Sequence, residues 1–229
     1  MKDFIEVYDN ALTPEMCKEI IEFFDGAPPE LKHSGQVYKD SWDISVDKSY
    51  KDSTDVWMNF HNWTEPDKII ASTLLTHIGK YREVHPEIDN VSTWELAELY
   101  NIQKYEPEQG YHAPHCECMD GTTARILAWM FYLNTVTDKG GTHFTNYDIT
   151  TDAVEGRLVI WPAYWTHTHH GIASPTQIKY IATGWYEFAQ KGLQLNEYFD
   201  EAVKQSKCCL LYTSPSPRDS CASRMPSSA

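Results

Sequence analysis

The second half of the chain alternates short apolar segments with turn signals, and this pattern limits the possible folds more than any other feature. Segments rich in aromatic and β-branched residues favour strands, because such side chains pack well on pleated surfaces. Turn signals such as Asp138–Gly141 and Glu155–Gly156 separate them. Closely spaced strands of this kind favour an antiparallel sandwich or closed barrel over a βαβ array. The predicted strands lie in TWELAELYNIQKY, YHAPHCE, RILAWMFYLNTV, THFTNY, the segment after Gly156, and IKYIATGWYEF.

The first 90 residues carry helix signals. Thr13 is a predicted N-cap and Pro14 stands at the first helical position, so a helix is expected to run from there to Gly26. A second helix is predicted over Pro66–Tyr81, where the apolar residues at helical spacing are Ile69, Ile70, Leu74, Leu75 and Ile78. Phe4–Tyr8 and KDSWDISVD are expected to be strands. The predicted fold class is mainly β, with N-terminal helices flanking a jelly-roll-like core.

The chain is expected to form one domain followed by a tail. Residues 1–90 would supply a strand and helical support, and residues 91–206 the catalytic core with a last helix near Asn196–Gln205. From Cys209 to Asp219 the chain reads CLLYTSPSPRD, which matches a reading frame through a transposase adapter used in sequencing libraries. We therefore expect residues 207–229 to be artefactual or disordered and to carry no function.

The composition favours a soluble cytoplasmic protein. No apolar run reaches membrane-spanning length, and the first residues lack the basic-then-apolar order of a signal peptide. The formal net charge of −14 argues against nucleic acid as a partner, because phosphate contacts need clustered Lys and Arg. Outside the tail, Cys17, Cys116 and Cys118 are odd in number and do not suit a disulfide scaffold.

A histidine and a carboxylate two residues apart, His115 and Glu117, suggest a metal site. On a strand the two side chains point to the same face. One distant histidine would complete three ligands on one side of an octahedral ion, the arrangement of non-haem Fe(II) oxygenases. An H-x-E pair alone is better explained as a solvated pair on a surface strand. The long apolar strand, the Gly-Gly turn and the histidine-bearing strand that follow favour the metal site. Three such ligands also describe catalytic zinc.

The third ligand has three candidates: His167, His169 and His170. Alternation places His167 and His169 on one strand face and His170 on the other. His169 is the predicted ligand, since it lies two residues before Gly171 and ten before Lys179, and His167 is the fallback. Cys116 and Cys118 are expected on the opposite face of their strand, as small buried side chains.

Lys179 lies on an apolar strand and has two interpretations. It is either an exposed residue of a half-buried strand or an inward ammonium that pairs with the distal carboxylate of 2-oxoglutarate, since a buried charge needs such an anion. Trp185 is expected to wall the pocket or fill the core. Tyr105 and Tyr111 are each either a hydroxyl donor to the co-substrate or an ordinary strand aromatic.

These segments resemble the prolyl 4-hydroxylase-like family of Fe(II)/2-oxoglutarate dioxygenases, including short phage-encoded members. YEPEQGYHAPHCE is similar to the family's tyrosine-led approach to an H-x-D pair, and RILAWMFYLNTV to its R-x-x-T-x-L-x-Y-L-N strand. HHGIASPTQIKYIATGW resembles the H-x-G stretch that ends in Lys and Trp, and FIEVYDNALTPEMCKEIIEFF the N-terminal strand and helix. Glu117 departs from the family's aspartate, and Ala128 from its usual threonine.

The resemblance implies a double-stranded β-helix (cupin-like) in which His115, Glu117 and His169 hold Fe(II) and Lys179 anchors 2-oxoglutarate. It implies consumption of O₂, release of succinate and CO₂, hydroxylation of a peptidyl proline, another protein side chain or a small molecule, and use of ascorbate. The alternative is a non-catalytic cupin-like binding protein, which would have no need of a dicarboxylate anchor at Lys179.

Overall fold

The computed structural model describes residues 2–40 and 43–189, all within one compact unit of the chain. The predicted last helix and the predicted tail lie outside these residues. The described elements are β1 Glu6–Tyr8, α1 Pro14–Gly26, η1 Pro29–Leu31, β2 Lys32–Ser34, β3 Val37–Asp40, β4 Asp43–Ser45, β5 Thr54–Asn59, η2 Phe60–Asn62, α2 Glu65–Val84, η3 Pro86–Asn90, β6 Trp94–Tyr105, β7 Arg125–Tyr132, β8 Thr142–Phe144, β9 Ile149–Thr151, β10 Leu158–Pro162, η4 Trp165–His167, β11 His169–Gly171 and β12 Lys179–Phe188.

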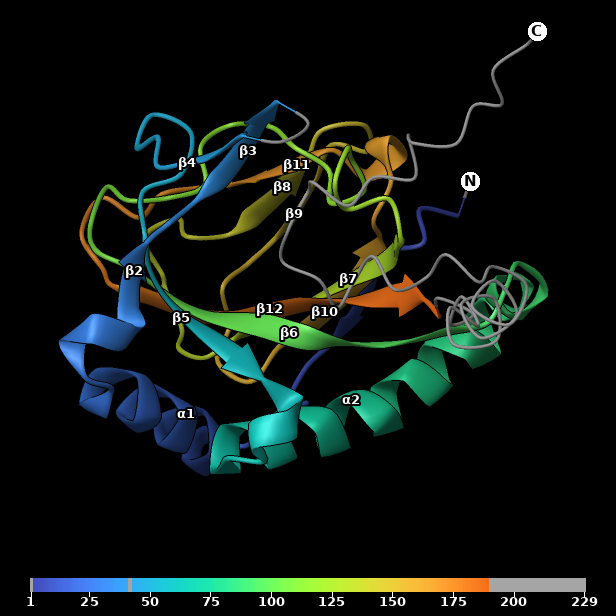
Figure 1. Ribbon diagram of the computed structural model, residues 1–229, viewed down its shortest axis with the longest axis horizontal. Helices are drawn as coiled ribbons and strands as arrows, with labels where there is room; N and C mark the ends of the chain where they lie inside the picture. Colours follow the sequence, from blue (N-terminus) through green and yellow to red (C-terminus); the bar gives the residue numbers. More distant parts are fainter. Residues whose placement is uncertain (1, 41–42, 190–229) are drawn as a thin grey trace, which may run out of the picture. The chain divides into compact units, whose positions relative to one another are not determined.

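Two antiparallel sheets form the core, as the strand spacing predicted. The larger has the order β1-β10-β7-β12-β6-β5-β2, and the smaller has the order β11-β8-β9. Helices α1 and α2 lie along one side of the large sheet, and the small sheet lies on its other side (Figure 1). Strands β3 and β4 pair with each other as a separate hairpin. KDSWDISVD, predicted as one edge strand, thus contributes to both strands of this hairpin.

The central strands β7 and β12 bury both faces, because they lie between the helices and the small sheet. On β12, Tyr180 and Ala182 join the core that contains α1 and α2. Ile181 joins a second core together with Phe144 of the small sheet. Alternation along β12 therefore turns Lys179, Ile181 and Thr183 toward the interior between the two sheets.

Both predicted helices form, and their N-terminal caps explain where they begin. The Thr13 side chain accepts a hydrogen bond from the Met16 backbone N–H, and Pro14 opens α1. At α2, the Thr64 backbone N–H donates to Asp67 Oδ2 at 2.7 Å. Leu75 was predicted in the apolar stripe but is 77% exposed. The α2 stripe that packs on the sheet is narrower than the apolar sequence pattern.

The predicted strand YHAPHCE is wrong. Within it only single bridges form, Lys51 to Tyr111 and His115 to His169. Pro114 has no N–H to donate to a ladder. The Glu117 and Cys118 backbone N–H groups both donate to Ala163 O, at a different strand end from His169. The segment 111–117 is therefore irregular and belongs to neither sheet; we call it the strap.

The shared strand predicted for His167 and His169 is also wrong, since His167 ends η4 and His169 begins β11.

None of the described helices is long and apolar enough to cross a bilayer.

Candidate metal centre and co-substrate pocket

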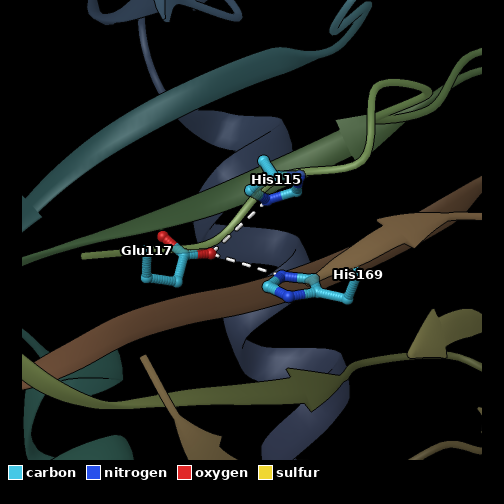
Figure 2. A group of neighbouring side chains, drawn as sticks. All are labelled: His115, Glu117 and His169. Carbon is cyan, nitrogen blue, oxygen red and sulfur yellow. Dashed lines mark ion pairs between the residues drawn. The ribbon is translucent and has the colours of Figure 1, made fainter. Parts of the chain in front are cut away.

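His115, Glu117 and His169 converge between the two sheets (Figure 2). One possible ligand atom from each lies within 4.8 Å of the other two. Glu117 Oε1 lies 3.5 Å from His115 Nε2 and 3.4 Å from His169 Nε2. Two backbone hydrogen bonds of 2.9 Å join His115 to His169, so the bridge between the segments fixes the spacing of the two rings.

Backbone carbonyls set the tautomer of both histidines. His115 Nδ1 lies 3.0 Å from Ala113 O, and His169 Nδ1 lies 2.8 Å from His167 O. Because a carbonyl oxygen only accepts, each neutral ring donates from Nδ1 and keeps a lone pair on Nε2. Two imidazole lone pairs and a carboxylate oxygen thus face the same point, which is how a metal centre orients its histidines.

Trp185 and Arg125 hold the far oxygen of the Glu117 carboxylate. Trp185 Nε1 donates to Oε2 at 2.8 Å, and Arg125 Nη1 lies 3.5 Å from the same atom. The Arg125 guanidinium stacks 3.5 Å from the centre of the Trp185 ring. The longer glutamate arm therefore reaches these donors with Oε2 while Oε1 stays beside the histidines.

Charge within the cluster suits a cation. Burial alone would raise the pKa of Glu117, but the adjacent His115 and His169 side chains hold it well below its usual range. Burial lowers the pKa of His115, and the nearby His169 lowers it further. The shifts thus favour an ionised Glu117 carboxylate beside a neutral His115 imidazole, the protonation state that binds a metal ion.

Lys179 lies in the same cavity as the three residues. Its side chain is buried, and Nζ donates to Gly140 O at 3.1 Å and lies 4.8 Å from the Tyr105 ring centre. No carboxylate in the described ranges lies within 4.0 Å of this ammonium, and burial lowers its pKa to about 8. The cavity is lined by Gln103, Tyr105, Tyr111, His115, Glu117, Met130, Thr142, Trp161, His169, Gly171, Lys179, Ile181 and Thr183.

The two tyrosines take different places. Tyr105 donates its hydroxyl to Gln103 Oε1 at 2.7 Å. Tyr111 stacks on the His115 imidazole, with ring centres 3.6 Å apart and planes 9° apart. The Tyr105 ring therefore lies beside Lys179, and the Tyr111 ring supports His115.

The remaining histidines and cysteines of these segments stand apart from the cluster. His167 Nε2 lies 2.6 Å from Asp3 O, and His170 pairs across strands with His143. Cys116 and Cys118 direct their thiols to backbone carbonyl oxygens. Neither cysteine belongs to the group that can hold an ion among the described residues.

Sequence reasoning missed several side chains of the site. Gln103 shares the face of Tyr105, so strand alternation would have found it. Arg125 appeared only as part of a resembling strand, and its contact with Glu117 is not visible in local sequence. Thr142 also lines the cavity, and its short strand carried no distinguishing signal.

Comparison with known proteins shows the fold and indicates which family the chain resembles. Residues 100–187 match the model of the 2OG-Fe(II) oxygenase superfamily, a range that begins on β6 and ends on β12. This region is similar to that superfamily. The match includes all three residues of the cluster and Lys179, and it supports an oxidoreductase of the dioxygenase class.

A curated relative and several solved structures agree. A putative prolyl 4-hydroxylase of Acanthamoeba polyphaga mimivirus is 23% identical over 198 residues, which cover 79% of this chain and 72% of the relative. A viral collagen prolyl hydroxylase from Paramecium Bursaria Chlorella virus-1, solved with 2OG, has a TM-score of 0.59 at 17% identity over 81% of this chain and 97% of its own. A Trichoplax adhaerens prolyl hydroxylase, solved with a hypoxia inducible factor peptide, has a TM-score of 0.60 at 16% identity over 81% and 84%. These similarities confirm the predicted jelly-roll fold.

The superfamily implies Fe(II), 2-oxoglutarate and O₂, and the residues present fit these groups. Two imidazoles and one carboxylate on one side of an ion leave positions open on the other. The buried Lys179 ammonium, which faces no carboxylate among the described residues, matches a dicarboxylate.

Proposed function

We propose that this chain is an Fe(II)- and 2-oxoglutarate-dependent dioxygenase that hydroxylates a C–H bond of a peptide side chain, prolyl or related. The observation that carries the proposal is a single cavity that contains both the His115–Glu117–His169 cluster and the buried Lys179 ammonium. A hydrolytic metal site does not need the second feature. A structural metal site needs neither the open side nor the lysine.

The chain's own side chains bind and orient the reactants. His115 Nε2, Glu117 Oε1 and His169 Nε2 would hold Fe(II), which supplies the redox chemistry of oxidative decarboxylation and open positions for 2-oxoglutarate and O₂. Lys179 Nζ would pair with the distal carboxylate of 2-oxoglutarate. Met130, Trp161 and Ile181 line the same cavity with apolar surface and exclude water.

The atoms of the proposed reaction balance. One O₂ provides one oxygen atom to succinate and one to the substrate hydroxyl. 2-Oxoglutarate loses its C1 carboxylate as CO₂ and supplies two electrons, and the substrate C–H becomes C–OH. Ascorbate is the proposed reductant that restores iron oxidised in turnovers without substrate.

The peptide class rests on the relatives. The Trichoplax adhaerens neighbour was solved with a peptide fragment, and the viral neighbour is a collagen prolyl hydroxylase. The same reasoning makes nucleic acid the less favoured substrate, in keeping with the acidic net charge of −14.

Succinate formation tests the proposal. Protein loaded with Fe(II) should convert 2-oxoglutarate to succinate in air, and the amount should rise when a proline-rich peptide library is added. His169→Ala should abolish succinate formation, while His170→Ala, one residue away and outside the cluster, should retain it. A wild-type protein that binds Fe(II) but forms no succinate under any of these conditions contradicts the proposal.

A further inference from the structure

A buried charged cluster lies behind the cavity without lining it. Asp55 and Lys51 are 3% and 6% exposed, and Lys51 Nζ donates to Asp55 Oδ2 at 2.6 Å. Ser53 Oγ donates to Asp55 Oδ1 at 2.7 Å, and Gln103 Nε2 lies 3.3 Å from Oδ2. A buried ion pair is often no more stabilising than apolar side chains of equal volume. Stability alone therefore does not explain these charges at this place.

One set of contacts connects Lys51 of the cluster to His115. Lys51 Nζ lies 5.7 Å from the centre of the Tyr111 ring, and the Lys51 and Tyr111 backbones form a bridge. Tyr111 in turn stacks flat on His115. A shift of the ammonium would move the ring against which the His115 imidazole rests.

A second set of contacts connects Asp55 to Lys179. A carboxylate only accepts hydrogen bonds, so Gln103 presents its amide nitrogen to Asp55 and its oxygen to Tyr105. The Tyr105 hydroxyl proton is thereby committed to Gln103. The Tyr105 ring then stands 4.8 Å from Lys179 Nζ. Asp55 thus sets the direction of the whole chain of hydrogen bonds.

We propose that Asp55 is a positioning residue, whose single carboxylate fixes both tyrosine walls of the cavity. It holds Tyr111 against His115 through Lys51, and it holds Tyr105 beside Lys179 through Gln103. The inference rests on the proposed function, since the two walls matter because one supports a metal ligand and the other a dicarboxylate site.

Direct binding measurements with Asp55→Asn test this role. Co(II) serves as the metal probe, followed by visible absorption, and 2-oxoglutarate is titrated calorimetrically into the Co(II)-loaded protein. The isosteric change removes the charge that holds Lys51 and fixes Gln103. Both affinities should fall by about 10-fold or more, as when other outer partners of metal ligands are removed.

Asp67→Asn is the matched control. Asp67 is also fully buried and accepts hydrogen bonds from Thr64 and from the Tyr100 hydroxyl at 2.8 Å, but it lies on α2, on the helix side of the large sheet. This variant should lose thermal stability while both affinities stay within about twofold of wild type.

The double variant Lys51→Met with Asp55→Leu covers the case in which Asp55→Asn does not fold. Apolar side chains of similar volume replace the pair, and such replacements are commonly tolerated. Its melting temperature should stay close to wild type while Co(II) and 2-oxoglutarate affinities fall by about 10-fold.

The outcomes separate the two proposals. Wild-type protein that binds neither Co(II) nor 2-oxoglutarate overturns the proposed function and the role of Asp55 together. Wild-type protein that binds both, with Asp55 variants within twofold of it, overturns the role of Asp55 alone. So does an Asp67→Asn variant that loses as much affinity as Asp55→Asn.

Discussion

The two halves of the site are built in different ways. His169 lies on β11, which pairs with β8, and Lys179 lies on β12, which pairs with β6. These ladders fix where each side chain points. His115 and Glu117 lie on the strap, an irregular segment that has isolated backbone hydrogen bonds and no ladder. Side-chain contacts with Tyr111, Trp185 and Arg125 orient them further. Strand ladders thus hold the distal half of the site, His169 and Lys179, whereas the proximal half, His115 and Glu117, depends more on side-chain contacts. Substitutions of side chains that surround the site, and are neither metal ligands nor Lys179, should therefore disturb His115 and Glu117 more than His169 and Lys179.

The largest expected effect is on the distal half and comes from removing its charge. Lys179→Met should weaken 2-oxoglutarate binding by about 30- to 5000-fold, the cost of truncating one partner of a buried charge pair. Co(II) affinity should stay near wild type, because Lys179 is not a ligand. Without 2-oxoglutarate, the variant should melt at a higher temperature than the wild type. The substitution removes a buried ammonium that has no carboxylate partner among the described residues. Calorimetry and thermal melts check this prediction, and unchanged 2-oxoglutarate affinity would contradict it.

Trp185→Phe tests the side-chain support of the proximal half. Loss of the hydrogen bond to Glu117 Oε2 should weaken Co(II) binding by about 10-fold, as expected for an outer partner of a metal ligand. Trp94→Phe is the control, because Trp94 Nε1 donates to Ile88 O on the helix side of the sheet. If both variants keep wild-type Co(II) affinity, the contact with Trp185 does not position Glu117.

The pH dependence of co-substrate binding sharpens the account of Lys179. Burial lowers its pKa to about 8, so the free protein loses this proton as pH rises through that value. Only the ammonium pairs with a carboxylate, so affinity is full below the pKa and declines above it. Relative to pH 7, affinity should fall about fourfold at half a unit above the pKa, in proportion to the protonated fraction. The residual binding of Lys179→Met should not change over the same range.

His167→Gln is expected to have the smallest effect. His167 Nε2 is engaged by Asp3 O, away from the cluster. Co(II) affinity should therefore stay within about twofold of wild type. A loss comparable to that of His169→Ala would make His167 a ligand and reverse the assignment.

The strands around His169 and Lys179 are the part of the site whose backbone the sequence indicated most clearly. Apolar segments around β7 and β12 indicated buried strands, and the spacing from His169 to Gly171 and Lys179 selected one histidine from three. Alternation along β12 then turns Lys179 into the cavity. The sequence pattern is sufficient here because strand pairing decides the direction of these side chains.

The proximal half shows where such reasoning ends. Strand alternation correctly put His115 and Glu117 together but for the wrong reason, because Pro114 and the split pairing to His169 and Ala163 prevent a strand. The hydrogen bond from Trp185 to Glu117 spans 68 residues and depends on how the strap packs against β12. The position of Asp55 was likewise not predictable, because β5 lies in a region whose sequence showed no clear strand or helix pattern.

The central claim is that the cluster and Lys179 form one site, and anaerobic absorption spectroscopy tests it most directly. Addition of 2-oxoglutarate to the Fe(II)-loaded wild-type protein should produce the charge-transfer band of a chelated Fe(II)–2-oxoglutarate pair. The band should be absent in His169→Ala and should need much higher 2-oxoglutarate in Lys179→Met. A wild-type protein that binds Fe(II) but shows no band at saturating 2-oxoglutarate would contradict the account.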